Sequence, residues 1–224
     1  MMVTDPKKQQ MSASLEERVT PEKVHTSDKI HVIACGAIAR EILAITRLNG
    51  LDHVELACLP AIWHAHPEKI APGVQESIKN ARLAGAKKIF VAYADCGTGG
   101  ALDKVLEEAG DVERLTGPHC YSFFAGNEDF AARWDDDLTA FFLTDFLARQ
   151  FEAFVIEPLG LDRHPELKEM YFSHYTKLIY LSQMEDPALQ EKAKAAADYL
   201  GVEYEYRFTG YGDLATELLA AARG

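Results

Sequence analysis

The hydrophobic positions of this chain follow two alternating periods from residue 29 onward. Short apolar runs rich in Ile, Val, Leu and Phe have the length and composition of buried strands. The stretches between them repeat apolar residues every three or four positions, which is typical of amphipathic helices. The expected strands are 29–35, 53–60, 87–95, 177–183 and 202–208, with a short one near 113–117. The expected helices lie within 37–50, 66–85, 99–110, 123–134, 138–155, 187–201 and 213–223.

Strands separated by helices predict right-handed βαβ units and a mostly parallel sheet. The expected fold class is therefore α/β and Rossmann-like, with flanking helices and a helical insertion in the middle of the chain. Residues 1–28 are polar without a sustained apolar period, which predicts a disordered N-terminal arm. Residues 29–224 then form a single α/β domain, or two intimate lobes over 29–125 and 126–224.

The amino-acid composition and net charge argue against some classes of binding partner. The 224 residues are 48% hydrophobic and 26% charged, as in an ordinary globular protein. A formal net charge of −12 argues against nucleic acid and anionic membranes as main partners, because both require a basic face. No run of about eighteen apolar residues would span a bilayer, and no signal-peptide core is visible near the N-terminus. We expect a cytoplasmic protein acting on a small molecule, either as a monomer or as a homo-oligomer.

Three of the four cysteines occupy equivalent places in the predicted pattern. Cys35 and Cys96 each follow a strand and precede a glycine, and Cys120 follows the short strand. Because ligands bind outside the carboxyl ends of parallel strands, we expect these thiols along one edge of the sheet. In a reducing compartment, metal binding, catalysis or inert burial is favoured over disulfides. Cys58, inside an apolar strand, is expected to be buried and structural.

Histidines accompany these thiols in the sequence. Two follow the strand that contains Cys58 and one precedes Cys120: His64, His66 and His119. Zinc prefers thiolate sulfur and imidazole nitrogen. The pattern predicts a zinc site formed by Cys35, Cys96, Cys120 and one of these histidines. Inert packing of each cysteine is the alternative, because cysteine is among the most buried residue types.

A second hypothesis keeps the cysteines without a metal. Cys96 stands beside Asp95 at the start of a helix, where a thiolate is favoured, and His119 would serve as its base. The catalytic candidates are thus Cys96, His119 and Asp95.

Two further motifs indicate anion binding. Backbone N–H groups of Gly36, Gly97, Gly99 and Gly100 could cradle a phosphate or carboxylate, although the motif is not a Walker loop. Arg163 beside Asp162 could clamp a carboxylate, or could simply pair with its neighbour.

Several long motifs resemble one known family: "IACGAIAREI", "YADCGTGGALD", "HCYSFFAG", "FFLTDFLARQFE" and "LGLDRHPEL". They are similar to a bacterial and archaeal family of unknown function, DUF1638, over roughly residues 30–212. Every candidate residue above falls on a family-like position except His66, so the resemblance favours His64 as the histidine ligand.

The resemblance also implies a metabolic setting. Members of the family are often encoded beside corrinoid proteins and trimethylamine-type methyltransferases. We therefore expect a zinc-dependent enzyme, with methyl transfer in methylated-amine or one-carbon metabolism as its reaction and a corrinoid or folate as co-substrate. A corrinoid protein or a methyltransferase would be the protein partner. The alternatives are a metal-free cysteine enzyme and a non-catalytic small-molecule-binding accessory protein.

Overall fold

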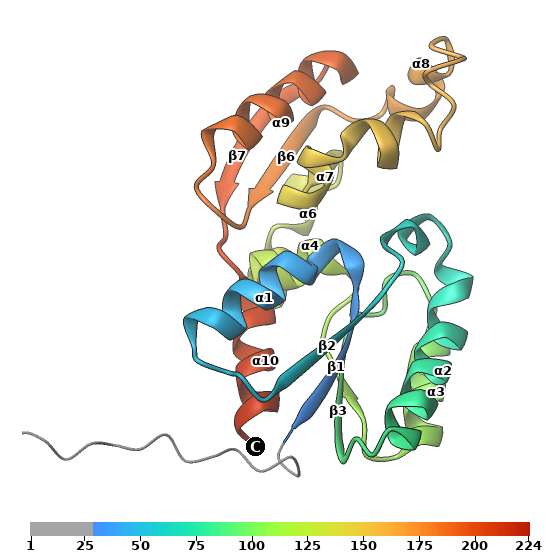
Figure 1. Cartoon of the computed structure of the whole chain (residues 1–224). Coiled ribbons are helices and arrows are strands. Elements are labelled where there is room, and N and C mark those ends of the chain that lie inside the picture. The colour runs from blue at the N-terminus through green and yellow to red at the C-terminus, as the bar shows by residue number, and fades with distance from the viewer. Residues whose placement is uncertain (1–28) are drawn as a thin grey trace, which may run out of the picture.

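The computed structural model describes residues 29–224, and the arm expected over residues 1–28 lies outside them. The described chain is an α/β fold of two parallel sheets flanked by helices, which confirms the predicted fold class (Figure 1). The strands are β1 (Ile30–Cys35), β2 (Val54–Leu59), β3 (Lys88–Ala92), β4 (Glu113–Arg114), β5 (Ala140–Leu143), β6 (Lys177–Ser182) and β7 (Glu203–Phe208). The α-helices are α1 (Ala39–Leu48), α2 (Ile70–Leu83), α3 (Ala101–Ala109), α4 (Cys120–Ala125), α5 (Asn127–Ala132), α6 (Trp134–Asp137), α7 (Asp145–Arg149), α8 (Leu167–Phe172), α9 (Pro187–Leu200) and α10 (Gly212–Arg223). Three 3-10 turns, η3 (Gly36–Ile38), η4 (Ala61–Ala65) and η5 (Pro67–Lys69), and a π-helix, η6 (Glu152–Ile156), complete the list.

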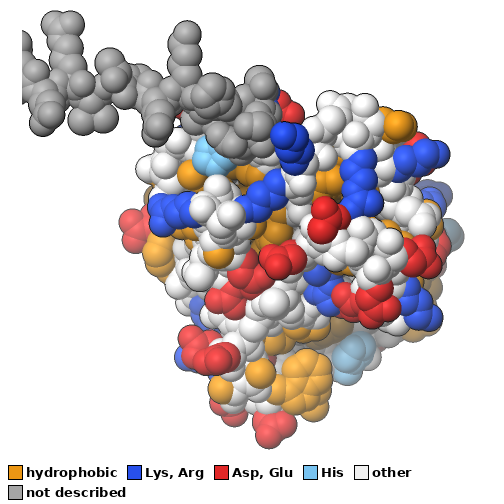
Figure 2. Space-filling model, turned by 90° about the horizontal axis from the view of Figure 1, so that it is seen from below, with side chains coloured by type: hydrophobic (Ala, Val, Ile, Leu, Met, Phe, Trp, Pro, Cys, Tyr) orange, Lys and Arg blue, Asp and Glu red, His pale blue; other side chains and the backbone are white. Residues whose placement is uncertain are grey.

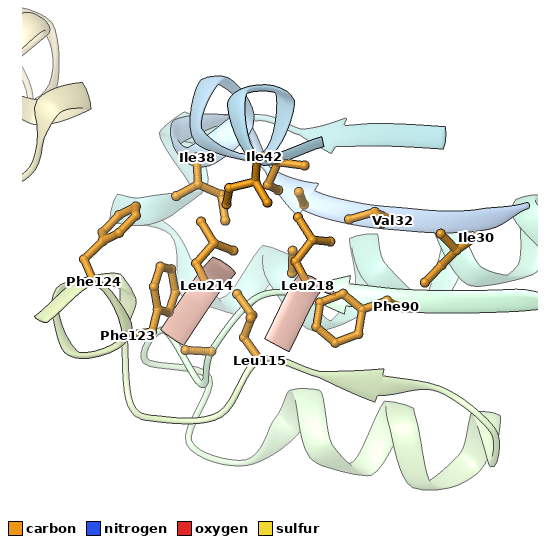
Figure 3. Close-up of a cluster of buried hydrophobic side chains, with 14 residues drawn as sticks. Ile30, Val32, Ile38, Ile42, Phe90, Leu115, Phe123, Phe124, Leu214 and Leu218 are labelled. Atoms are coloured by element: carbon orange, nitrogen blue, oxygen red, sulfur yellow. The ribbon is translucent and has the colours of Figure 1, made fainter. Parts of the chain in front are cut away.

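The first sheet has the strand order β2-β1-β3-β4 and is covered on both faces. Successive side chains of a strand point to opposite faces, so Val32 of β1 packs toward α1 and α10 while Ile33 packs toward α2 and α3. Figure 3 shows the first of these cores, in which Ile42 of α1 meets Leu214 and Leu218 of α10 above the sheet. Both faces are apolar, as a parallel sheet between helices requires.

The second sheet has the order β5-β6-β7. Leu178 and Tyr180 of β6 face a core shared with α7 and α9, and the alternate residues Ile179 and Leu181 face Tyr121 of α4. Helix α4 therefore belongs to the connection between the sheets and also contacts the second one.

Strand β5 corrects one expectation. The segment 138–155 is not a continuous helix, because Ala140–Leu143 pairs in parallel with β6 before α7 begins. An apolar run of four residues cannot be assigned to strand or helix by periodicity alone. Its two phenylalanines favour a strand once a partner strand lies beside it.

The chain crosses between the two sheets twice. Helices α4, α5 and α6 lead from the first sheet to the second, and α10 returns from β7 to pack beside α1 (Figure 1). Gly212, the first residue of α10, allows a close approach: a Cβ there would lie 2.2 Å from the carbonyl oxygen of Phe123. The N–H of Asn127 donates to Oδ2 of Asp213 (2.7 Å), which joins the two crossings directly.

The carboxyl ends of the two sheets face one another. Strands β6 and β7 end on the side that faces the first sheet, whose β1 ends beneath them at η3 and α1 (Figure 1). Helix α7, which follows β5, contacts η3, which follows β1. The opposite edge of the first sheet carries acidic and basic side chains interspersed, without a concentration of either (Figure 2). Between residues 29 and 224, no helix has the length and apolarity needed to cross a membrane.

Candidate functional site

The first thiol lies where β1 ends. Cys35 is the last residue of the strand and directly precedes η3, and its side chain is partly buried. Packing favours glycine at position 36, because a Cβ there would lie 3.0 Å from the carbonyl oxygen of Leu59. The glycine lets the turn after β1 lie close to the end of β2, a packing role that the sequence pattern did not predict.

The glycine-rich loop after β3 is organised around Asp95. Its carboxylate accepts hydrogen bonds from Oγ1 of Thr98 (2.8 Å) and from the N–H groups of Gly97 (3.2 Å), Gly99 (3.3 Å) and Gly100 (2.9 Å). Burial opposes ionisation, but these bonds outweigh it and hold the pKa of Asp95 below its usual value. The predicted anion cradle is therefore filled by a carboxylate of the chain itself, which is a correction to Gly97, Gly99 and Gly100 as free anion donors.

Cys96 is fixed by the turn that precedes α4. Its N–H donates to the carbonyl oxygen of Pro118 (2.8 Å), and that of Asp95 donates to Gly117 (3.1 Å). Within residues 29–224, Cys96 is the single non-glycine residue with a positive φ, at 50°. These two bonds bring the loop after β3 to the segment that contains His119 and Cys120.

Cys35, Cys96 and Cys120 lie near one another, because Cys35 affects the pKa of Cys96 and both affect that of Cys120. Each is partly accessible to solvent, yet burial is the largest cause of the raised pKa of each thiol. Burial and then the neighbouring Cys35 raise the pKa of Cys96 to about 12. Burial, Cys96 and Cys35 together raise the pKa of Cys120 well above its usual value. The neutral thiol is therefore the favoured form of all three.

Cys58 differs from the expectation. It is exposed rather than buried, because β2 is the edge strand of the first sheet and only part of its length is covered by helices. It is near enough to Cys35 to raise the pKa of that thiol slightly.

The histidines separate into two kinds. Burial lowers the pKa of both His64, in η4, and His119, and the two rings are close enough for His64 to lower the pKa of His119 further. His66 points elsewhere and pairs with Glu68 at 3.4 Å on the exposed surface. His64 therefore lies near His119, whereas His66 pairs with Glu68 on the surface.

The tautomer of His119 limits what it can do. Its Nδ1 accepts from the N–H of Ser122 (3.3 Å), so the neutral ring carries its proton on Nε2. The ring packs at centroid distances of 5.3 Å from Tyr121 and 5.1 Å from Phe130. In this tautomer Nε2 carries the proton, so it can donate a hydrogen bond but cannot take a proton from Cys96.

The donor set fits zinc in its chemistry but not in its present arrangement. In the described part of the chain, no three His, Cys, Asp or Glu side chains are placed to hold one metal ion together. Cys35, Cys96, Cys120 and His64 gather at one edge without forming a finished coordination shell.

Asp162 and Arg163 lie away from this group. They occupy an exposed loop of the second sheet's half, between η6 and α8, and Nε of Arg163 pairs with Oδ2 of Asp162 at 3.5 Å. The ion pair expected as the alternative is present, and the described contacts of these residues do not join them to the thiols.

Sequence reasoning missed the buried acids and hydroxyl beside the site. Glu41 in the first turn of α1 and Asp145 at the start of α7 are both buried, and burial is the largest cause of the raised pKa of each. Asp145 also raises the pKa of Glu41. Asp145 accepts from Oη of Tyr180 (2.6 Å) and from the N–H groups of Gln183 and Met184 (3.1 Å each). Tyr93, after β3, is the buried hydroxyl. Tyr93 lies near the carboxyl end of a predicted strand, which was the available signal for it, whereas Glu41 and Asp145 fall within predicted helices and had no such signal.

A hollow of about 560 Å³ opens behind the turn before α4. Its walls include Pro118, Phe130 and Trp134, and none of the four cysteines lines it. Its size suits a small molecule, but the thiols do not contribute to its walls.

Comparison with known proteins gives a family and no activity. Neither the curated proteins nor the solved structures that were compared include a match to this chain. The family described as "Protein of unknown function (DUF1638)" matches residues 58–218, a span that includes Cys96, His119 and Cys120 and begins after Cys35. Because this match covers most of the chain and agrees with the motifs noted above, the chain belongs to the DUF1638 family.

Proposed function

We propose that this protein is a zinc-dependent enzyme acting on a small molecule at the carboxyl edge of the first sheet. The observation that supports it is the convergence of Cys35, Cys96 and Cys120 from three separate segments. Small-molecule sites in α/β proteins lie at this edge, and here a second sheet faces it. The substrate would bind between the two carboxyl edges.

The state of the thiols favours a metal over a free cysteine nucleophile. With a pKa of about 12 for Cys96, only about 1 in 10⁵ molecules carries its thiolate at pH 7. His119 cannot take the proton in its present tautomer. A thiophilic cation removes the protons from clustered thiols and neutralises their mutual repulsion. Cys35, Cys96, Cys120 and His64 would hold the ion once their side chains had rotated toward it, and the ion would keep the bound sulfurs deprotonated.

Methyl transfer is the reaction that we propose for this site. A zinc ion bound by thiolates keeps a soft sulfur nucleophile available at neutral pH. The setting that the resemblance implies, beside corrinoid proteins and methyltransferases, supports a corrinoid or folate as methyl donor, with one of those proteins as partner.

Cobalt titration tests the metal site. Co²⁺ bound by thiolates gives intense near-ultraviolet charge-transfer absorption, so stoichiometric binding to the full chain is expected to produce it. Cys35→Ser, Cys96→Ser and Cys120→Ser should each weaken binding at least about tenfold. Cys58→Ser is the matched control, because Cys58 is the exposed thiol on the neighbouring strand. Absence of this absorption in the wild-type protein, or an equal loss in Cys58→Ser, would overturn the zinc proposal.

Methyl transfer has its own test. The zinc-loaded protein is incubated with methylcobalamin or methyltetrahydrofolate and a small thiol, and loss of the methyl donor is followed by absorbance. We expect turnover that Cys96→Ser abolishes. Equal rates with the wild type, the variant and zinc alone would remove methyl transfer while leaving the metal site standing.

A further inference from the structure

The hydroxyl group of Tyr93 has no hydrogen-bond acceptor among the described residues. The residue follows β3 and is 2% exposed, and its hydroxyl oxygen is buried without a hydrogen-bond partner among the described residues. Leaving a buried polar group unpaired costs about 1–3 kcal/mol. Such a cost is maintained at functional sites more often than elsewhere, so the surroundings of this hydroxyl are informative.

The pairing of the strands places Tyr93 next to Cys35. Strands β1 and β3 pair in parallel with Ala34 opposite Ala92, so the following residues, Cys35 and Tyr93, continue side by side. Cys35 is two positions after Ile33, and Tyr93 is two positions after Val91. Both therefore lie on the face of the sheet covered by α2 and α3, and Cys35 packs against the cluster that contains Tyr93.

The Tyr93 hydroxyl and the Cys35 thiol affect one another's pKa without forming a hydrogen bond. The hydroxyl lowers the pKa of the Cys35 thiol, and the thiol raises the pKa of Tyr93, although burial is the largest cause of both shifts. The geometry stops short of a formed hydrogen bond, since the Tyr93 oxygen has no partner. A neutral thiol is a weak acceptor, whereas a negatively charged sulfur is a strong one.

A helix terminus does not distinguish Cys35 from the other thiols, because Cys35 precedes η3 and α1 while Cys120 begins α4. What distinguishes Cys35 is the unpaired hydroxyl of Tyr93, which the strand register places at its side.

We propose that Tyr93 is the positioning residue of Cys35, donating its hydroxyl to the Cys35 sulfur when that sulfur binds a cation or attacks an electrophile. The ligand class is a thiophilic cation or a soft electrophile bound at Cys35. The choice of a cation rests on the proposed function, whereas the pairing of Tyr93 with Cys35 rests on the strand register and the unpaired hydroxyl. The family match begins at residue 58, so nothing in it assigns Cys35.

The test compares the wild type with Tyr93→Phe in the full chain, using two probes. Cd²⁺ affinity is read from thiolate–cadmium absorption, and the rate of alkylation by iodoacetamide is read at each cysteine by peptide mass spectrometry. We expect Tyr93→Phe to lower Cd²⁺ affinity at least about tenfold and to slow alkylation of Cys35 several-fold. The metal-free variant should be no less stable than the wild type, because an unpaired polar group has been removed.

The chain supplies a matched control. Tyr204 on β7 also has a buried hydroxyl without a partner, but it belongs to the second sheet's core. Tyr204→Phe should leave both probes unchanged. In a Cys35→Ser background, Tyr93→Phe should have no further effect on Cd²⁺ binding if it acts through Cys35.

The outcomes separate this inference from the proposed function. If Cd²⁺ does not bind the wild type but Tyr93→Phe still slows alkylation of Cys35, zinc is excluded and the pairing stands. If both probes are unchanged by Tyr93→Phe, the pairing is wrong even when Cd²⁺ binds. Loss of stability in metal-free Tyr93→Phe would also overturn it, because the hydroxyl would then have a structural partner.

Discussion

At the scale of single residues, Cys96 combines a strained backbone conformation with a thiol that is a candidate metal ligand. Its φ of 50° places a Cβ where L-residues are disfavoured by about 1–2 kcal/mol. The conformation is held by the bond to Pro118 on one side and by the Asp95-centred loop on the other. Strained residues of this kind concentrate at functional sites, which supports a role for Cys96 beyond packing.

Because of this strain, the glycine variant at position 96 should be more stable than the alanine variant, the reverse of the usual order. Glycine adopts a positive φ without penalty, so Cys96→Gly should be more stable than Cys96→Ala by about 1 kcal/mol. Urea unfolding of both variants measures the difference. Cys120 begins α4, where the usual order should hold and alanine should be the more stable. If alanine were better at both positions, the turn would relax once the thiol is removed.

Individual roles were harder to predict than the gathering of the thiols. Cys35 ends a strand, and Cys96 and Cys120 each follow one after a short loop, which is the signal from which a common edge was predicted. The exposure of Cys58 depended on β2 being the edge strand, which only the strand order reveals. The use of Gly97, Gly99 and Gly100 by Asp95 depended on a side-chain rotamer that no spacing encodes.

At the scale of elements, Asp137 ties α6 to two strands. Its carboxylate is nearly buried and accepts from Nη2 of Arg207 on β7 (2.9 Å) and from Nζ of Lys177 on β6 (2.8 Å). The bond from Arg207 is the main reason that the pKa of Asp137 falls to about 2, with burial opposing it and Lys177 assisting. The triple-aspartate run therefore holds one structural residue among solvated ones.

Removing this carboxylate should destabilise the fold in a pH-dependent way. Asp137→Asn leaves Arg207 and Lys177 partly uncompensated, and we expect a loss of about 2–4 kcal/mol at pH 7. The folded pKa is lowered, so the stabilisation is present above the unfolded value of about 3.9 and is lost as pH falls toward 2. Urea unfolding at pH 7 and pH 3 should show the difference between wild type and variant shrinking. Asp136→Asn, at the exposed neighbour, should change stability little at either pH.

The prediction of elements failed where tertiary pairing decides the conformation. Most helices and strands have the predicted positions, because their periodicity extends over two or more turns or over five or six strand residues. Strand β5 has four residues within an aromatic segment, and only its pairing with β6 distinguishes it from a helix. The π-helix η6 that follows α7 likewise has no sequence signature.

At the scale of the whole molecule, the alternation of strands and helices predicted parallel pairing but not its division between two sheets. The alternative division into two lobes, 29–125 and 126–224, has its boundary near the crossing through α4 to α6. However, α10 returns to the first sheet. That return depends on contacts such as Gly212 against Phe123 and Asn127 with Asp213, which join positions far apart in the sequence. Long-range pairings of this kind are not visible in local periodicity.

The return of α10 to the first sheet also encloses Glu41 of α1 between the halves of the molecule that contain the two sheets. Its Oε2 is buried without a partner among the described residues, and the groups around it are Asp145 and Arg149 of α7, Arg40 of its own helix and Tyr211 before α10. Burial is the largest cause of the raised pKa of Glu41. Its own backbone N–H opposes the shift, Asp145 adds to it, and the two arginines oppose it least. An ionised Glu41 is therefore unfavourable in this arrangement.

Glu41→Gln should consequently stabilise the protein at neutral and higher pH. Because the folded pKa is raised, the protonated carboxyl favours folding below the unfolded value of about 4.3, and this contribution is lost as pH rises. We expect the variant to exceed the wild type by about 1–2 kcal/mol at pH 8, and the two to converge near pH 4, in urea unfolding. Glu152→Gln, at an exposed acid on η6, should show no such trend. A variant less stable than the wild type at pH 8 would mean that Glu41 is ionised and paired, and that the two sheets close on a salt bridge instead of a neutral acid.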